Sequence, residues 1–266
     1  MPRISRTEQE QQLMADRSPE FLEVLARGLK VIAAFDAERR QLTLSDLARI
    51  VDLPRASVRR VLITLESLGY VEADGRLFSL TPRILSLATS YLMSNTVPRV
   101  MQAIVDRLSA EAEETCSAAV LQGDEAVFVA RAAPRRVIRV GEEIGYRLPV
   151  YCSAVGRVLL GQYSEAELDA YLARVPLERL TARTITDPAV LKATVVTSRS
   201  EGYALVDEEA EAGLRSIAVP VRRFDGKIVC ALHFGVQVER VSIGRMHDEF
   251  LPLLRAGAAE AERLLV

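Results

Sequence analysis

The sequence contains few of the residues that stabilise secreted proteins or bind metal ions. Its 266 residues include only three cysteines and two histidines. Cys116, Cys152 and Cys230 are far apart and odd in number, which argues against a disulfide framework and against a CxxC metal site. The same scarcity is typical of a reducing compartment. We therefore expect a cytoplasmic protein that carries no metal ion and no other cofactor.

The chain also lacks an excess of charge of either sign. Its net charge is −2 at pH 7, so any binding to nucleic acid must depend on a local basic patch. No apolar run approaches the length of a membrane span, and the polar start MPRISRTEQEQQ is unlike a signal peptide. We expect residues 1–17 to form a flexible N-terminus and the protein to have no membrane partner.

Sequence motifs of common enzymes are missing as well. The chain has no GxSxG elbow, no HExxH and no phosphate-binding glycine loop. One enzymatic alternative stays open: Cys152 precedes a predicted helix whose dipole would lower the thiol pKa, and His233 could act as its base. A small, buried cysteine is the commoner state, so we expect no enzymatic activity.

Three helix patterns occupy residues 18–69. The first begins at Ser18, which is suited to an N-cap, and the second, TLSDLARIVDL, ends at Asp52. The third begins at Pro54 and ends at Gly69. We expect the apolar stripe of the first helix to face a core: Phe21, Leu22, Leu25, Leu29 and Ile32. The stripe of the third helix is equally regular: Val58, Val61, Leu62, Leu65 and Leu68.

Two short extended runs then flank Asp74-Gly75, a dipeptide that strongly favours a hairpin. Helix, helix, turn, helix and hairpin in this order are the plan of a winged helix-turn-helix, which we assign to residues 18–80 as a DNA-binding domain. The next segment, TPRILSLATSYLMSN, predicts one more helix, and we assign residues 81–97 to a helical linker.

The start of the third helix, DLPRASVRR, concentrates arginines on the side away from the apolar stripe, with no acid before Glu66. In a helix-turn-helix this part of the second helix enters the major groove, where arginine binds guanine edges or phosphates. A solvated charged face and a protein-binding surface are the alternatives. The acid-free face favours double-stranded operator DNA. The predicted contacts are Ser45, Arg55, Ala56, Ser57, Arg59, Arg60, Thr64 and Arg76.

Residues 98–266 read as a second domain of the α+β class with a mainly antiparallel sheet. A long amphipathic helix comes first. Strands are predicted from SAAVLQ, EAVFVARA, RVIRVGE, LRSIAVPVRR and KIVCALHFGV. Helices are predicted from SAVGRVLLG, SEAELDAYL, DPAVLKATVVTSRSEG and the closing segment SIGRMHDEFLPLLRAGAAEAERLL.

These motifs resemble one known family. LTLSDLARIVDLPRASVRRVLITLESLGYVE is similar to the winged helix-turn-helix of IclR-type bacterial transcription regulators, and RLPVYCSAVGRVLLG and SEGYALVDEEAEAGLRSIAVPVRR are similar to their effector domain. YRLPVYCSAVGRVLL and LTARTITD further resemble the branch that controls protocatechuate, p-hydroxybenzoate and β-ketoadipate catabolism. The resemblance spans Ser18 to Leu265. It implies a homodimer or dimer of dimers and an effector domain that binds small organic acids.

A candidate effector site lies where YCSAVGRVLLG opens a helix. Ser153 is suited to an N-cap, and the backbone N–H groups of Ala154, Val155 and Gly156 could bind an anion. Spacing alone is equally compatible with a simple cap and a packing glycine. The resemblance implies that effector contacts map to Ala154 and Val155.

The resemblance carries further effector positions to Asp207, Ser216, His233 and Gly235. Ser216 stands where the family often has Cys, and His233 where Asn or Ser is usual. Other cations that could pair with an acid are Arg136, Arg139 and Arg147, of which Arg136 is expected at the surface. The sequence therefore predicts a ligand-responsive, DNA-binding regulator of an aromatic-acid catabolic operon that senses a small aromatic or ring-cleaved carboxylate.

Overall fold

The protein is described by a computed structural model that covers residues 20–36, 38–134 and 143–265. It divides into two compact units, the first ending at Thr89 and the second beginning at Ser90. This boundary falls inside helix α5 (Leu85–Ser94), within the stretch that we expected to be the linker. Before α5 lies a 3₁₀ turn (Pro82–Ile84), and Asn95 separates α5 from α6 (Thr96–Ala112), so the expected linker is two helical segments and the start of a third.

The first unit is a winged helix-turn-helix, as predicted. Its elements are α2 (Glu23–Ala33), β1 (Leu42–Thr43), α3 (Leu44–Ile50), α4 (Arg55–Ser67), β2 (Val71–Asp74) and β3 (Leu77–Leu80). The strands form an antiparallel sheet in the order β1-β3-β2. Thr43 and Asp46 form a capping box that starts α3, and Gly69 ends α4 with a left-handed backbone, φ 75°.

The predicted core stripe of the first helix is wrong except at Ile32, which packs against the core. Phe21, Leu22, Leu25 and Leu29 are exposed, and the part of α2 that packs into the core is its C-terminal end, where Val31 is fully buried. Val31 is the buried residue of this helix, and Ala34, just after it, is buried as well. Ser18, the expected N-cap, lies outside the described residues.

The second unit is built on a six-stranded sheet in the order β6-β5-β4-β9-β8-β7, with every pairing antiparallel. The strands are β4 (Thr115–Gln122), β5 (Glu125–Ala132), β6 (Arg147–Pro149), β7 (Ala204–Asp207), β8 (Leu214–Arg222) and β9 (Ile228–Gln237). The antiparallel α+β prediction is confirmed. The short edge strands β6 and β7 were not predicted, and RVIRVGE lies outside the described residues.

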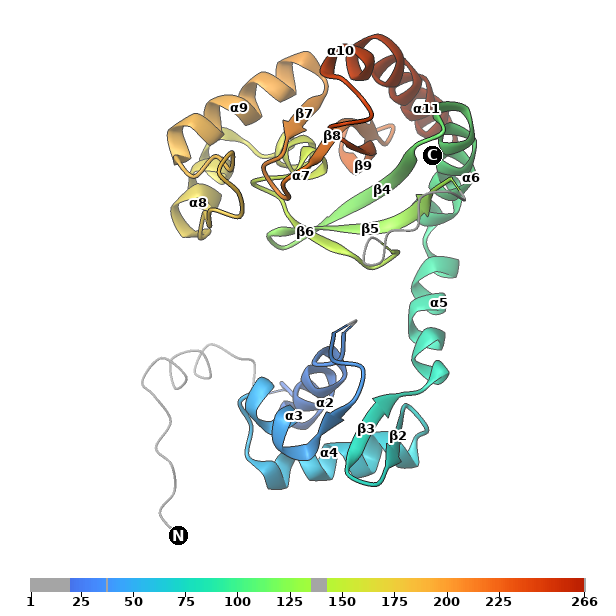
Figure 1. The fold of residues 1–266 in the computed structure, drawn as a ribbon, viewed down its shortest axis with the longest axis vertical. Coiled ribbons are helices and arrows are strands. Elements are labelled where there is room, and N and C mark those ends of the chain that lie inside the picture. Colours follow the sequence, from blue (N-terminus) through green and yellow to red (C-terminus); the bar gives the residue numbers. More distant parts are fainter. Residues whose placement is uncertain (1–19, 37, 135–142, 266) are drawn as a thin grey trace. The chain divides into compact units, whose positions relative to one another are not determined.

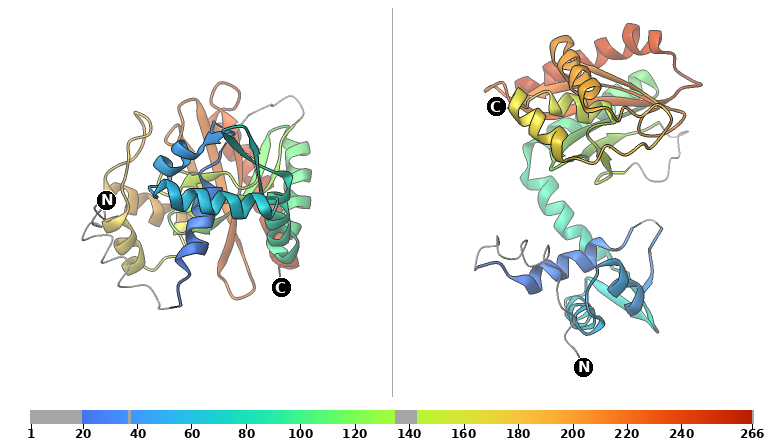
Figure 2. Two further views of the ribbon diagram at one scale, coloured as in Figure 1. Left: turned by 90° about the horizontal axis from the view of Figure 1, so that it is seen from below. Right: turned by 90° about the vertical axis from the view of Figure 1, so that its left-hand side faces the viewer.

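Helices cover both faces of this sheet. On one face α6 and α11 (Leu251–Leu264) lie side by side, and on the other lies α7 (Ala154–Leu160), with α8 (Glu165–Arg174) and α9 (Pro188–Glu201) beside it (Figures 1 and 2). The helix before α11 is not continuous: α10 (Ile243–Arg245) opens into a π-helical turn (Met246–Phe250) just before Pro252. Proline has no N–H to donate to the preceding turn, which accounts for the irregularity.

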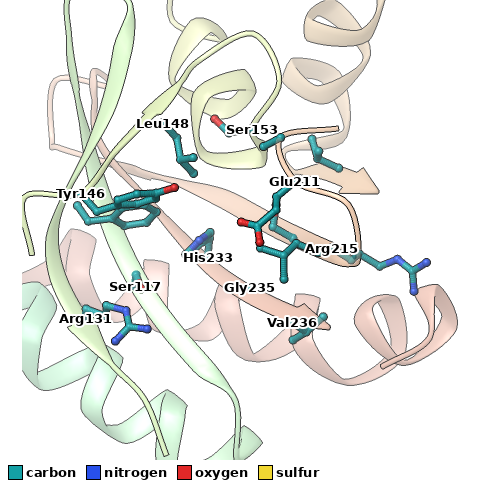
Figure 3. Close-up of a pocket in the computed structure, with 15 residues that line it drawn as sticks. Ser117, Arg131, Tyr146, Leu148, Ser153, Glu211, Arg215, His233, Gly235 and Val236 are labelled. Carbon is teal, nitrogen blue, oxygen red and sulfur yellow. The ribbon is translucent and has the colours of Figure 1, made fainter. Parts of the chain in front are cut away.

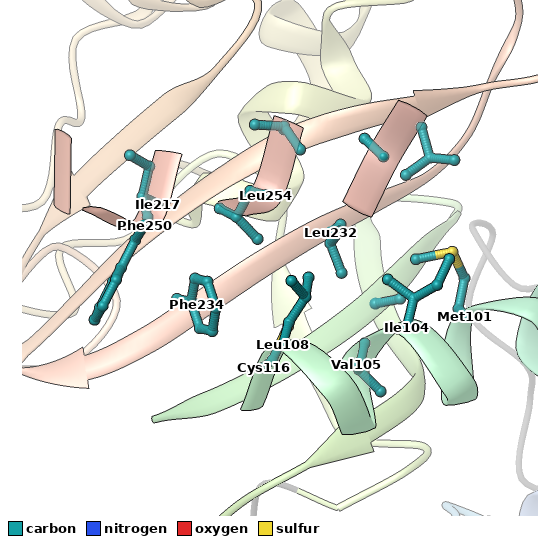
Figure 4. Close-up of a cluster of buried hydrophobic side chains, with 14 of the residues drawn as sticks. Met101, Ile104, Val105, Leu108, Cys116, Ile217, Leu232, Phe234, Phe250 and Leu254 are labelled. Atoms are coloured by element: carbon teal, nitrogen blue, oxygen red, sulfur yellow. The ribbon is translucent and has the colours of Figure 1, made fainter. Parts of the chain in front are cut away.

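The α6–α11 face holds one apolar core. Met101, Leu108, Leu232 and Leu254 are fully buried in it, and the rings of Phe234 and Phe250 lie 4.7 Å apart (Figure 4). The α7 face has a separate core, and there the sheet leaves room for a cavity.

Candidate functional sites

The predicted DNA-binding residues lie on one helix and its neighbours in the first unit. Arg55, Ala56, Arg59, Arg60 and Thr64 are exposed on α4, and Ser57 is half-buried. Ser45 is exposed on α3 and Arg76 at the β2–β3 turn. The Thr64 hydroxyl donates to the Arg60 carbonyl oxygen at 3.0 Å, so this hydroxyl is hydrogen-bonded within its own helix.

The arginines of α4 differ from Arg27, Arg39 and Arg49 of the same unit in how their charge is compensated. Arg27, Arg39 and Arg49 each pair with a carboxylate of the same helix or turn. Among the ion pairs of the described residues, none involves Arg55, Arg59 or Arg60. Three uncompensated guanidinium groups on one exposed face attract an anionic surface such as the phosphate backbone.

The second unit contains a cavity of about 70 Å³ on the α7 face of the sheet (Figure 3). Central strands supply its floor: Ser117 of β4 pairs with His233 of β9, and Ser216 of β8 pairs with Gly235 of β9. Alternate residues of a strand share a face, so these four positions look toward α7. The lining is completed by Phe128, Arg131, Tyr146, Leu148, Ser153, Val206, Ala210, Glu211, Leu214, Arg215 and Val236.

Aromatic rings form one wall of the cavity. Phe128 and Tyr146 are stacked with ring centroids 5.9 Å apart and planes 15° apart, and His233 lies 5.1 Å from Phe128. Tyr146 precedes β6 and Leu148 lies within it. The residue between them, Arg147, faces outward, where it pairs with Glu125 at 2.7 Å and donates to Gln122 at 3.0 Å. Arg147 is therefore not a cavity cation, while Arg136 and Arg139 lie outside the described residues.

A β-bulge gives the cavity a cation that the sequence pattern did not reveal. Ala119 pairs with Phe128 and Ala118 with Ala130, so Val129 is an extra residue on β5. Beyond this bulge Arg131 shares the cavity face with Phe128, three positions earlier, whereas Ala130 turns to the opposite core. Regular alternation would have placed Arg131 on the other face of the sheet.

The second lining cation is Arg215, which is bound to Asp207 and to the backbone of Val241. Its Nε lies 2.6 Å from Asp207 Oδ1, and its Nη1 donates to the Val241 carbonyl oxygen at 2.8 Å. Figure 3 shows its guanidinium directed away from the other labelled residues, whereas Arg131 lies beside Ser117. Asp207, predicted as an effector contact, does not line the cavity; it holds Arg215 and also pairs with Arg183.

The start of α7 serves packing more than the sequence suggested. Ser153 lines the cavity, donates to the Pro149 carbonyl oxygen at 2.9 Å and accepts the Gly156 N–H at 3.2 Å, so this donor is occupied by the cap. Ala154, Val155 and Gly156 are fully buried and do not line the cavity. A leucine at Ala154 would disturb the core before it blocked a ligand.

The loop after β7 closes another side of the cavity with Ala210 and Glu211. It is held from below by a buried ion pair, Arg157 Nη2 to Glu209 Oε2 at 2.6 Å. The Thr184 hydroxyl donates to the Glu209 carbonyl oxygen at 2.7 Å, and Ile185 N–H donates to the Glu209 carboxylate at 3.1 Å. The segment LTARTITD thus positions a wall of the cavity.

The enzymatic alternative, an activated Cys152, does not fit the surroundings of this thiol. Burial, with a smaller contribution from the Glu209 carboxylate, raises the pKa of this thiol to about 11. The thiol donates weakly to the Pro149 carbonyl oxygen at 3.8 Å, and Cys152 is not among the residues that line the cavity. At neutral pH it is a protonated core residue and a poor nucleophile.

Two structural features bear on metal and membrane binding. In the described part of the chain, no helix is long and apolar enough to cross a membrane. Within those same ranges, no three His, Cys, Asp or Glu side chains gather where they could hold a metal ion.

A winged helix with an uncompensated arginine face, followed by a unit with a small-molecule cavity, is the composition of a DNA-binding transcription regulator. Comparison with known proteins gives the family. Residues 24–75 match the IclR helix-turn-helix domain and residues 89–263 match the bacterial transcriptional regulator IclR C-terminal domain. The chain belongs to the IclR family of bacterial transcription regulators, which confirms the resemblance seen in the sequence.

Two curated relatives are similar to this chain over most of its length. The chain is 41% identical to the Pca regulon regulatory protein of Pseudomonas putida, with 91% of this chain and 84% of that protein covered. It is 36% identical to the p-hydroxybenzoate hydroxylase transcriptional activator of Acinetobacter baylyi, with 94% of both covered.

Solved structures agree with this fold. A regulator from Rhodococcus sp. RHA1 is 44% identical, with a TM-score of 0.82 over 92% of this chain and 98% of that one. An IclR homologue from Microbacterium hydrocarbonoxydans, solved in complex with 4-hydroxybenzoate, is 26% identical, with a TM-score of 0.77 over 91% and 99% of the two chains.

Proposed function

We propose that this regulator controls an aromatic-acid catabolic operon and senses a small aromatic or ring-cleaved carboxylate in the cavity of its second unit. The observation that carries the proposal is the Phe128–Tyr146 stack on the same cavity face as Arg131. An aromatic wall accommodates a flat ring, and an arginine binds a carboxylate with two parallel hydrogen bonds. Ser117, Ser153, Ser216 and His233 offer polar partners for ring hydroxyls.

The relatives point the same way. One is named for the Pca regulon, one for the activation of p-hydroxybenzoate hydroxylase, and the Microbacterium homologue was crystallised with 4-hydroxybenzoate. The decisive experiment is calorimetric titration of the purified full chain with 4-hydroxybenzoate, protocatechuate and the ring-cleavage products of such acids. Absence of binding by every member of this panel at millimolar concentration would overturn the proposed effector class.

Arg131→Met is expected to weaken binding of the preferred acid about 10-fold to 100-fold, because a hydrogen bond to a charged group is worth about 1.5–3 kcal/mol. Arg147→Met is the matched control, since Arg147 faces outward from the neighbouring strand and its loss should leave the affinity unchanged. The amide analogue of the acid should bind wild type and Arg131→Met alike. Equal affinity of both variants for the acid would show that Arg131 does not bind the carboxylate.

For the first unit, we propose that α4 contacts operator DNA through Arg55, Ser57, Arg59 and Arg60, with Ser45, Ala56, Thr64 and Arg76 alongside. Arg55→Ala and Arg60→Ala are each expected to weaken specific binding by about 1–3 kcal/mol, the value of one good base contact, while the fold stays intact. The measurement is a gel-shift titration on a duplex selected in vitro by the wild-type chain. Arg107→Ala, an exposed change in the second unit, is the control. Unchanged affinity of both α4 variants would refute the assignment.

We further propose that the working form is a homodimer, alone or as a dimer of dimers, on a pseudo-palindrome with half-sites about 34 Å or a multiple apart. Support comes from α5, where Leu85, Leu87, Tyr91 and Met93 are exposed. The apolar residues of α6 are buried in its own unit and do not contribute. Leu87→Glu with Met93→Glu should shift the sedimentation coefficient toward the monomer at micromolar concentration and weaken operator binding. A wild-type monomer that binds its operator undiminished would contradict this.

A further inference from the structure

We propose that Gln102 couples the cavity to the helix that leads to the DNA-binding unit, by holding the backbone of Arg131; this inference rests on the effector site proposed above. The Gln102 side chain forms hydrogen bonds with both backbone groups of Arg131, its N–H and its carbonyl oxygen. Its Oε1 accepts the Arg131 N–H at 3.3 Å, and its Nε2 donates to the Arg131 carbonyl oxygen at 3.0 Å. The side-chain amide thus donates one hydrogen bond and accepts one, as a residue of a neighbouring strand does.

Gln102 meets β5 beyond the residues that pair with β6. Within residues 20–36, 38–134 and 143–265, β5 pairs on its outer edge with β6 from Glu125 to Val127, and backbone bonds also join Phe128 to Tyr146 and Gly145. Arg131 lies beyond this pairing. Backbone N–H and C=O groups that are withdrawn from water require partners, and Gln102 supplies them from α6.

Arg131 is also the residue that the bulge turns into the cavity. Beyond the bulge at Val129, Arg131 stays paired with Ser117 of β4, and Gln102 adds two hydrogen bonds to the same Arg131 backbone. A carboxylate that draws the Arg131 guanidinium toward the ring stack pulls on the same backbone. That displacement reaches Gln102 directly, over one residue and two hydrogen bonds.

Helix α6 is well placed to pass the displacement on. Met101, just before Gln102, and Val105, in the next turn, are fully buried, so this part of the helix is packed rather than loose. Close-packed elements shift as bodies between discrete arrangements. Toward its N-terminus α6 is continuous in the chain with Asn95 and α5, which lead to the winged helix. A ligand that favours one position of α6 therefore biases the element from which the DNA-binding unit extends.

The test compares full-length wild type with Gln102→Met and Gln102→Ala. Methionine keeps the volume of the side chain and removes both hydrogen bonds. The matched control is Asp106→Ala, which removes only the other partner of Gln102, the Asp106 carboxylate at 2.9 Å, and leaves the contact with Arg131 in place. Each protein is titrated calorimetrically with 4-hydroxybenzoate and protocatechuate. Hydrogen exchange of peptides from residues 85–112 and from residues 143–153 is then measured with and without the acid that binds.

In wild type and Asp106→Ala the acid should change exchange both at the cavity peptide and in residues 85–112. In both Gln102 variants the acid should still bind, within several-fold of the wild-type affinity, and the change should be confined to the cavity peptide. The ratio of operator affinities with and without the acid, expected at about 5-fold to 150-fold in wild type, should fall toward one.

The outcomes separate the two proposals. If wild type binds neither acid, the effector class is wrong and the coupling falls with it. If wild type binds an acid and the exchange of residues 85–112 does not respond, the coupling through Gln102 is wrong and the effector site stands. The coupling is equally overturned if Gln102→Met, shown to be folded by thermal melting, keeps the wild-type change in hydrogen exchange of residues 85–112.

Discussion

Replacing Gly156 with alanine is expected to destabilise the second unit by about 3 kcal/mol or more, the upper end of what an overpacked core costs. A Cβ atom at this position would lie 2.2 Å from the Val150 Cα and carbonyl oxygen and 2.5 Å from the Val150 carbonyl carbon. All three are backbone atoms, which cannot rotate out of the way. Helix α7 must then move off the segment that carries Ser153 and Leu148 into the cavity, so ligand affinity should fall as well.

Gly244→Ala provides the control for this prediction. Gly244 is also helical and belongs to the same unit, but the nearest atom to its added Cβ is the Ser242 Oγ at 3.8 Å, an ordinary contact. Alanine there should be neutral or slightly stabilising, because it favours helix over glycine. Chemical denaturation followed by circular dichroism measures both variants. If Gly156→Ala costs no more than Gly244→Ala, the close approach of α7 to Val150 does not determine the stability of this unit.

The same glycine shows what the sequence pattern could not distinguish. The sequence allowed two explanations for Ser153 followed three residues later by Gly156: an anion site at a helix start, or a cap and a packing glycine. Both patterns are short and local, whereas the atoms that decide between them belong to Val150 and Pro149. The structure favours packing at Gly156 and leaves Ser153 as the member of the segment that reaches the cavity.

Local signals were sufficient where one element determines its own form. The capping residue Thr43 and the terminating Gly69 place the helices of the winged domain. The predicted α4 stripe is buried from Val58 to Leu65, whereas its last member, Leu68, is exposed. The prediction failed for most of α2. An apolar stripe indicates which side of a helix is apolar, but it does not indicate whether another element of the same unit packs against that side. The α2 leucines Leu25 and Leu29 are exposed, as are the apolar residues Leu85 and Leu87 of α5.

The cavity was predicted only in part, for a physical reason. Ser216, His233 and Gly235, which the family resemblance implied, share one face of β8 and β9, and all three line the cavity. Arg131 breaks the alternation, since a bulge adds one residue to β5 and reverses the faces beyond it. Nothing within EAVFVARA indicates this bulge. Alternation around Arg147 could have identified Tyr146 and Leu148, but the segment is too short to be recognised as a strand.

The buried pair between Arg157 and Glu209 yields the other large effect. The side chains of these residues are 2% and 8% exposed, and their atoms meet at 2.6 Å. Removing one partner leaves a charge inside the protein, which costs about 3–5 kcal/mol. Glu209 also anchors the loop whose next residues, Ala210 and Glu211, line the cavity. Stability and ligand binding are therefore expected to fail together.

Arg157→Met should lower the free energy of unfolding of the second unit by about 3–5 kcal/mol, because the Glu209 carboxylate keeps the Ile185 N–H and loses its counter-charge. Adding Glu209→Gln should restore part of this loss, since the uncharged amide still accepts that N–H. Arg174→Met is the matched control: its two hydrogen bonds to Asp124, at 2.5 and 2.6 Å, are as short, but the side chains are 57% and 35% exposed, so the denaturation midpoint should hardly move. In calorimetry with 4-hydroxybenzoate, Arg157→Met should show the weakest binding of the three variants. Equal midpoints for Arg157→Met and Arg174→Met, or a double variant less stable than Arg157→Met, would show that burial of charge is not what this pair contributes.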